Sequence, residues 1–389
     1  MAQQSTDHQA SLTRPGQSNA TGDARALYLK LFSGEMFKGF QNNAIARDLV
    51  MKRTLKNGKS LQFIYTGHTK AEYHTPGNSI LGNSDGAPPV AEKTITCDDL
   101  LISSAFVYEL DETLAHYELR GEISKKIGYA LAEKYDRLIF RAITQGARKA
   151  SPITKANFIE PGGTQVRVGA AGTPAQSEAF NADNLIAAFY DAAAALDEKG
   201  VSTDGRVGVL NPRQYYELIQ KVGDGGLVNR DVQGGSLQSG KGVVEIAGIK
   251  IYKSMNIPFF DKYGIKYGIS GGPADPGNTG SFISQQIESA KTTDTGINNS
   301  YGQGLQQSDG TATGGDGNFN HSCGLIFQKE AAGVVEAIGP SVQVTSGDVS
   351  VIYQGDVILG RLAMGADYLN PAACVELYAG NATGNSAWS

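Results

Sequence analysis

The feature that most constrains this chain is a helical pattern that runs without interruption over residues 111–147. Asp111 is a suitable N-cap, and acidic residues follow it while arginines gather at the other end, as the helix dipole favours. Apolar side chains recur between them at intervals of three, four and seven residues. A typical globular helix has about 11 to 12 residues, so this pattern predicts a rod of about 55 Å that spans a whole domain. Gly121 and Gly128 break the heptad spacing and argue against a coiled coil.

The composition is that of a globular protein with room for two or three domains, because 40% of its 389 residues are hydrophobic and 19% are charged. No apolar run approaches the ~20 residues of a membrane span. Residues 1–22 lack the apolar centre of a signal peptide, which predicts a protein that stays in the cytosol where it is made. A net charge of −5 without a run of lysine or arginine predicts at most weak contact with DNA.

Cysteine and glycine usage narrow the choice of architecture further. Cys97, Cys323 and Cys374 are odd in number and far apart, which argues against a disulfide framework or a four-ligand zinc site and predicts buried, reduced thiols. The chain has 49 glycines, whereas average usage of ~7% would give about 27. Because the excess is concentrated in residues 223–242 and 271–317, we expect long surface loops there.

Two segments that precede the long helix have the character of projecting arms. Asp23 is a suitable cap for a helix with one apolar face, formed by Leu27, Leu31, Met36 and Phe40. Residues 59–108 change to a period of two around a polar, turn-rich tip at 76–89, which predicts a long two-stranded arm. An isolated hairpin is marginal in water, so this one should lie on another surface. We favour the surface of a neighbouring molecule over the chain's own core.

The remainder mixes helices and strands without a regular βαβ count, which predicts an α+β fold. Residues 151–180 read as a loop, and residues 181–200 as an amphipathic helix that ends in a glycine cap. A second helix begins at Pro212 with Tyr215, Leu218 and Ile219 on its buried face. Strands are expected at residues 206–210, 243–252, 265–269, 324–328, 334–338, 349–359 and 374–378.

A glycine-rich stretch at residues 235–241 has the spacing of a phosphate-binding loop. Gly242 follows it where a serine or threonine should bind magnesium, and the next residues favour a strand. Without a helix there is no dipole to hold the phosphate. A glycine-rich hairpin is therefore the better interpretation of this stretch.

Ser270 stands between glycines as in the nucleophile elbow of α/β-hydrolases, and Asp275 or Asp294 and then His321 follow in the order of a triad. That elbow requires a helix directly after the serine, and Pro273 with the neighbouring glycines forbids one. A serine hydrolase that uses Ser270 therefore stays only as an alternative.

Two weaker patterns could hold a metal ion. Residues 314–320 resemble one copy of a calcium-binding glycine and aspartate repeat, which requires tandem copies. His68, Glu72 and His74 could meet a metal, although two histidines offer only two good ligands. Solvated loop and turn residues are the simpler interpretation of both patterns. We therefore predict no enzyme activity, no cofactor and no metal site, and the residues indicate assembly rather than chemistry.

The order of these parts resembles the HK97-like fold of the major capsid proteins of tailed phages. The sequence is similar to the capsid proteins of short-tailed podoviruses of the autographivirus group, from Leu27 to about Leu377. The stretches that carry the resemblance are residues 26–35 (ALYLKLFSGE), 57–63 (NGKSLQF), 71–77 (AEYHTPG), 115–120 (AHYELR), 248–258 (GIKIYKSMNIP) and 363–366 (AMGA). None of them is a catalytic signature. They support the resemblance because all of them occur together and in the same order as in the family.

The resemblance implies a division into five parts. These are an N-terminal arm at 1–58, an extended β-hairpin or E-loop at 59–110, a P-domain at 111–180 with its spine helix at 111–147, an axial A-domain at 181–340, and P-domain return strands with the C-terminus at 341–389. Residues 271–320 depart from the family pattern and look like an insertion in the A-domain.

The resemblance also implies a function. A chain of this family would be a major head protein that forms the hexamers and pentamers of an icosahedral shell around double-stranded DNA. Its partners would be other copies of itself, a separate scaffolding protein, a portal protein at one vertex and, weakly, the packaged DNA, with no membrane. It would be assembled in the host cytoplasm and reside in the virion. A surface-lattice protein is a further alternative, but such a protein would carry an export signal.

Candidates for contacts between subunits follow from the arm, the hairpin and the helix. They are Leu31, Phe37 and Phe40 from the arm, Tyr73 and Pro76 from the hairpin, and Glu112, Arg120 and Lys125 from the spine helix. Charges on an exposed helix face are also commonly just solvated, so the three helix residues have that alternative.

Overall fold

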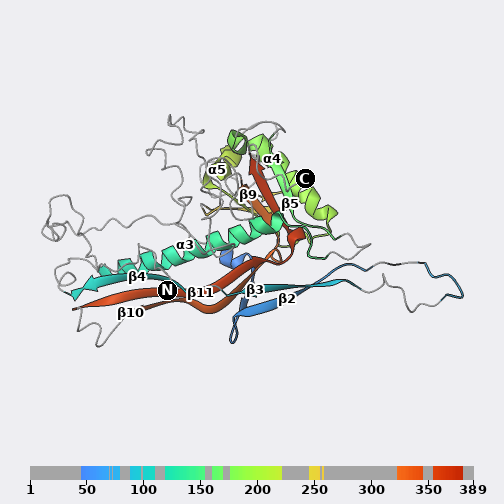
Figure 1. The fold of residues 1–389 in the computed structure, drawn as a ribbon. Coiled ribbons are helices and arrows are strands. Elements are labelled where there is room, and N and C mark those ends of the chain that lie inside the picture. Colours follow the sequence, from blue (N-terminus) through green and yellow to red (C-terminus); the bar gives the residue numbers. More distant parts are fainter. Residues whose placement is uncertain are drawn as a thin grey trace, which may run out of the picture. The chain divides into compact units, whose positions relative to one another are not determined.

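The structure is a computed structural model, and its described residues form two compact units (Figure 1). They are residues 45–69, 71, 73–78, 88–97, 100–109, 119–153, 160–169, 176–220, 245–254, 256–257, 322–344 and 354–379. Unit 1 takes its described residues from 100–109, 119–135, 336–344 and 354–364, and unit 2 takes the others. The predicted helix at 23–40, the strand at 265–269 and both glycine-rich segments lie outside the described residues.

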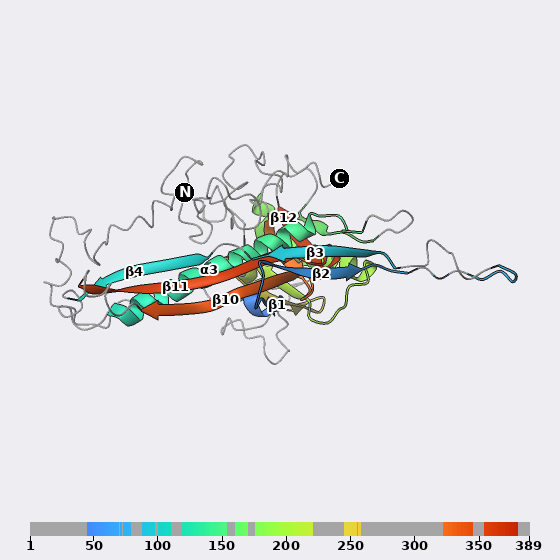
Figure 2. The same cartoon turned by 60° about the horizontal axis from the view of Figure 1, so that its bottom comes forward.

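Unit 1 combines a helix with a sheet. β4 (Leu101–Tyr108) pairs antiparallel with β11 (Gly355–Tyr368), with Tyr108 opposite Gly355. The strand order is β1-β10-β11-β4, in which β1 (Met51–Thr54) belongs to unit 2, and β10 (Ala332–Val344) and β11 each belong in part to both units. Figure 2 shows α3 (Leu119–Ala147) running along these strands. Ile127 and Leu131 of α3 pack on Val107 and Ile358, so the apolar spacing seen in the sequence is the buried stripe of this helix.

The long helical pattern ends as predicted, since α3 ends at Ala147. Its predicted start at Asp111 lies outside the described residues. The last turns of α3 are buried on every side, so their polar side chains need partners inside the protein. Asp136 accepts hydrogen bonds from the backbone N–H groups of Ile45 (2.8 Å) and Ala46 (3.0 Å), which ties residues 45–48 to the helix.

Unit 2 is built on a six-stranded mixed sheet in the order β5-β12-β9-β6-β8-β7. β12 runs parallel to β5 and antiparallel to β9, and β6 runs antiparallel to β9 and parallel to β8. The strands are β5 Thr164–Val168, β6 Val207–Leu210, β7 Glu245–Ile246, β8 Ile249–Lys253, β9 Ser322–Phe327 and β12 Cys374–Ala379. Figure 1 shows α4 (Ala182–Glu198) and α5 (Pro212–Gln220) beside this sheet.

Local sequence signals place both helices of unit 2. The Asn181 side chain accepts a hydrogen bond from the Asp183 N–H and caps α4, and Gly200 follows the helix at φ +70°. Pro212 is the first residue of α5, as predicted. A Cβ at Gly208 would lie 2.8 Å from the Phe189 ring, so this glycine lets α4 approach β6 closely. The α+β fold class is confirmed.

Two sequence predictions are wrong because they missed strand pairing. Residues 243–252 do not form one strand, since β7 and β8 make a hairpin whose turn residues Ala247 and Gly248 have φ of 51° and 74°. Glycine adopts such a conformation freely but alanine rarely does, so Gly248 was the one signal for this turn. Residues 151–180 are not all loop, because they contain β5 and the 3-10 helix Gln176–Phe180. β5 is completed by β12, which is far away in the sequence.

The two-stranded arm is shorter than predicted. β2 (Ser60–Thr66) and β3 (Val90–Thr96) pair antiparallel, with Ser60 opposite Thr96 and Thr66 opposite Val90. β4 is not part of this arm, because it pairs with β11.

The paired strands also lie on their own chain. Ile95 is buried, and Lys93 contacts Asp367 at 2.8 Å. A Cβ at Gly333 would lie 3.1 Å from Ile95 Cδ1. β2 and β3 thus pack in part on their own chain, and contact of the hairpin with a neighbouring molecule stays a prediction.

Candidate functional site

The described residues offer no candidate metal centre. They hold no group of three or more histidine, cysteine or acidic side chains that could bind a metal ion. His68 Nδ1 is 2.8 Å from Glu160 Oε2, so its ring has a carboxylate partner inside the protein, and His74 is exposed. Ser270, Asp275, Asp294, His321 and Glu72 lie outside the described residues, as do residues 235–241 and 314–320. No described helix is apolar over a length sufficient to span a bilayer.

The three thiols are buried, as predicted from their number and spacing. Burial raises the pKa of Cys323 to about 12 and raises the pKa of Cys374 well above its usual range. The reactive form of cysteine is the thiolate. We therefore expect all three cysteines to resist maleimide at pH 7 in the folded protein and to react within minutes in denaturant, as measured by intact mass. Rapid labelling of Cys323 or Cys374 in the native chain would contradict this.

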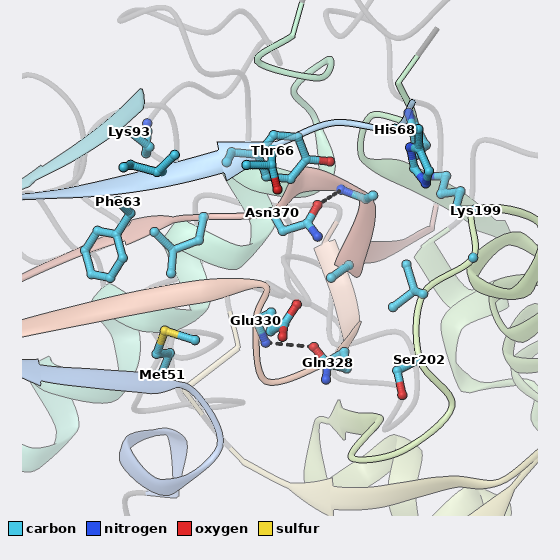
Figure 3. A pocket seen from close by; sticks show the side chains of 18 of the residues that line it. Met51, Phe63, Thr66, His68, Lys93, Lys199, Ser202, Gln328, Glu330 and Asn370 are labelled. Atoms are coloured by element: carbon cyan, nitrogen blue, oxygen red, sulfur yellow. Dashed lines mark hydrogen bonds between the residues drawn. The ribbon is translucent and has the colours of Figure 1, made fainter. Parts of the chain in front are cut away.

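A groove of about 900 Å³ lies in unit 2 beneath the base of the hairpin. Its walls come from β1, β2, the turn between β9 and β10, the segment after α4 and the segment before β12. Figure 3 shows Phe63 and Met51 at one end, Gln328 and Glu330 below, and His68 and Lys199 at the other end. Burial lowers the pKa of Lys199, whose ammonium donates to Gly162 O (2.5 Å) and to Thr164 Oγ1. The ammonium of Lys199 is therefore bound by groups of its own unit.

The point where the hairpin leaves this groove has tight packing. The Gly67 N–H donates to Pro89 O at 2.8 Å and adds one bond beyond the ladder of β2 and β3. A Cβ at Gly67 would lie 2.5 Å from Glu160 Oε1 and 2.7 Å from Ile153 Cδ1. The Glu160 side chain is 1% exposed, whereas that of His68 is 75% exposed. A buried carboxylate thus meets the hairpin where the chain passes into solvent.

Large apolar side chains are exposed on both units. On the hairpin they are Ile64, Val90 and Tyr73, and Tyr73 is fully exposed. On β10 they are Ile338, Val342 and Val344, which share one face of the strand because residues two apart point the same way. Exposed apolar groups of this kind commonly mark protein interaction surfaces. These residues are the strongest structural candidates for contact with another molecule.

The structure leaves the predicted contact residues only partly described. Tyr73, Pro76 and Lys125 are exposed, as a contact residue in an isolated chain should be. Arg120 belongs to α3, but its side chain is outside the described residues, as are Leu31, Phe37, Phe40 and Glu112. The sequence analysis missed Glu160 and the exposed face of β10. The alternating residues of β10 were a usable signal for its face, whereas Glu160 stands in a predicted loop and had none.

Comparison with known proteins agrees with a role in assembly. Residues 62–279, more than half of the chain, match the model of the Gp10A-like family, which is described as major capsid protein. The major capsid protein of Escherichia phage T7 is 29% identical over 204 residues, which are 51% of this chain and 58% of that protein. The matched part of this chain thus spans little more than half the length of that curated relative.

Solved structures extend the similarity to nearly the entire chain. The capsid structure of cyanophage P-SCSP1u is 30% identical with a TM-score of 0.68, and the alignment covers 93% of this chain and 96% of that one. The mature capsid of bacteriophage PhiM1 is 15% identical with a TM-score of 0.61 and covers 97% and 99%. At that identity the second likeness concerns the fold alone.

Proposed function

Because the chain belongs to the Gp10A-like family of major capsid proteins, we propose that it is the shell-forming subunit of a phage head. The observation that carries this proposal is the likeness to the cyanophage capsid over 93% of the chain. The geometry supports it, because the described residues expose apolar side chains on a projecting hairpin and on a long strand. Contact between copies would bury those side chains, and removal of apolar surface from water would stabilise the assembly.

We assign the parts of the subunit as the resemblance implies. The E-loop is 59–110, the spine helix 111–147, the A-domain 181–340, and the P-domain 111–180 with return strands in 341–389. Within the range 59–110, only β2 and β3 pair as a hairpin, and β4 pairs with β11 of the return strands. The order of the elements along the chain supports this division. β12, placed among the return strands, shares a sheet with β6 and β9 of the A-domain. The A-domain and the return strands therefore share one six-stranded sheet, and the boundary at residue 340 does not separate two independent cores.

In this proposal, copies of the chain form hexamers and pentamers of an icosahedral shell around double-stranded DNA. Closed symmetry lets one subunit make the same contacts many times. A scaffolding protein, a portal protein at one vertex and weak contacts with the packaged DNA complete the set of partners, and assembly takes place in the host cytoplasm. The net charge of −5 supports weak rather than tight DNA contact.

Deletion of the two arms tests this function. We expect a chain that lacks residues 1–40, or one that lacks residues 78–89, to stay soluble and folded by circular dichroism but to form few closed shells. The reason is that arms which bury surface on a neighbour contribute to assembly and little to the fold of the subunit. Electron microscopy of protein made with and without the scaffolding partner is the measurement. The matched control is Ser270→Ala, which should assemble like the wild type, and normal shells from both deletions would refute the proposal.

A further inference from the structure

A buried carboxylate, Glu160, lies against the base of the hairpin, and its hydrogen-bond partners among the described residues come from the hairpin. Glu160 Oε1 accepts a hydrogen bond from the His68 backbone N–H at 2.5 Å, and Glu160 Oε2 lies 2.8 Å from His68 Nδ1. The Glu160 side chain is only 1% exposed. A buried carboxylate is costly unless it is hydrogen-bonded or paired, so these two contacts tie Glu160 and the hairpin to one another.

The contact stands at the boundary between the packed and the exposed parts of the hairpin. Leu61, Phe63 and Tyr65 of β2 line the groove and are half-buried, whereas every described residue from 68 to 78 is exposed. Gly67 is packed so closely on Glu160 and Ile153 that a Cβ would not fit without a shift. Glu160 therefore contacts the hairpin at the position where its outer limb, residues 68–78, begins.

A separate contact holds the base on the other strand. Lys93 of β3 forms a 2.8 Å ion pair with Asp367, and its ammonium lies 3.8 Å from the centre of the Tyr368 ring. Burial would lower the pKa of Lys93, but the hydrogen bond and charge of Asp367, with Tyr368, raise it instead. The base is thus anchored through β3 independently of Glu160, and loss of the Glu160 contact should leave that anchor in place.

We propose that Glu160 is a positioning residue for the outer limb, and that its contact with His68 sets the direction in which the hairpin leaves unit 2. The negative charge of Glu160 also reaches Tyr65, whose pKa is raised first by burial and then by that charge. This inference rests on the proposed function in one respect, which is that the outer limb makes contacts between subunits. The positioning itself is a property of the single chain.

Hydrogen exchange of the unassembled full-length chain tests the positioning directly. In Glu160→Ala we expect exchange in peptides that cover 67–78 and 88–91 to rise about tenfold or more, because a hydrogen bond to a charged group is lost. Exchange in β9 and β12 should not change. Glu160→Gln should restore most of the protection, because its amide oxygen still accepts from the His68 N–H. His74→Ala is the matched control, since His74 is an exposed histidine on the same limb.

His68→Ala separates the ring from the backbone contact. It should raise exchange in the limb less than Glu160→Ala does, because the residue 68 N–H still reaches the carboxylate. Unchanged exchange in the limb of Glu160→Ala would overturn the inference, and so would an equal rise in β9 and β12, which would make Glu160 a general stability residue. If Glu160→Ala does not fold, His68→Ala takes its place. A rise in limb exchange for His68→Ala above that of Glu160→Gln and His74→Ala supports the inference, and equal exchange in all three overturns it.

Assembly of the same variants separates this inference from the proposed function. A looser limb together with a several-fold lower yield of closed shells for Glu160→Ala supports both. A looser limb with shells of normal yield and shape upholds the positioning of the limb and refutes its use in assembly. Failure of the wild-type chain to form shells with its scaffolding partner refutes the proposed function and leaves the exchange result intact.

Discussion

Replacement of Gly365 by alanine is expected to lower the free energy of unfolding of unit 2 by about 3 kcal/mol, the upper end for overpacking of a core. A Cβ on this residue of β11 would lie 1.9 Å from Thr96 O, 2.8 Å from Thr96 C and 3.1 Å from Cys97 Cα. All three are backbone atoms, so no flexible side chain can move aside. The Cys97 N–H also donates to Lys59 O at 2.7 Å, which holds this backbone at the end of the hairpin.

Urea denaturation of the unassembled chain, followed by circular dichroism, measures the effect of Gly365→Ala as a lower midpoint. Gly339→Ala in β10 is the matched control, because a Cβ there has no atom within 4 Å among the described residues and the midpoint should change little. Gly365 is part of the stretch 363–366 that carries the family resemblance. The close approach of β11 to residues 96 and 97 explains why a residue without a side chain is needed at this position. A variant as stable as the wild type would show that the two segments can separate without cost.

Local signals predicted the elements that depend on neighbours in the sequence. The end of α3 at Ala147, the helix expected at 181–200 and Pro212 at the start of α5 are all confirmed, because caps and helical periodicity act within one or two turns. β9 and β12 are buried strands in the sheet of unit 2 and lie near their predicted positions.

The failures concern contacts between distant segments. β4 was assigned to the hairpin because its alternating pattern continues that of β3. No local sequence signal indicates that β4 pairs with β11 instead. β5 carries polar residues at an edge of the sheet and becomes a strand only through β12. The same reason explains the candidate site. Exposure of Tyr73 and Lys125 agreed with their local pattern, whereas the contacts of Lys93 with Asp367 and of Glu160 with His68 join residues that no local pattern connects.

Loss of the Arg148 guanidinium is expected to have the largest effect of any single substitution considered, about 3–5 kcal/mol of unfolding free energy. Its Nε and Nη2 atoms donate to the two oxygens of Glu376 at 2.8 Å and 2.6 Å. The side chain of Glu376 is 0% exposed and that of Arg148 is 5% exposed. In Arg148→Ala the Glu376 carboxylate keeps the hydrogen bond from Gln165 Nε2 at 2.7 Å, which cannot balance its charge.

A double variant separates the effect of the buried charges from the effect of side-chain volume. Arg148→Met combined with Glu376→Leu should recover most of the stability lost in Arg148→Ala, because an apolar pair leaves no buried charge without its partner. Lys149→Ala, at the exposed neighbouring position, should stay within about 0.5 kcal/mol of the wild type. Denaturation midpoints of the unassembled chains are the measurement. A double variant as unstable as Arg148→Ala would mean that Arg148 acts through packing at the end of α3, and that its charge contributes little.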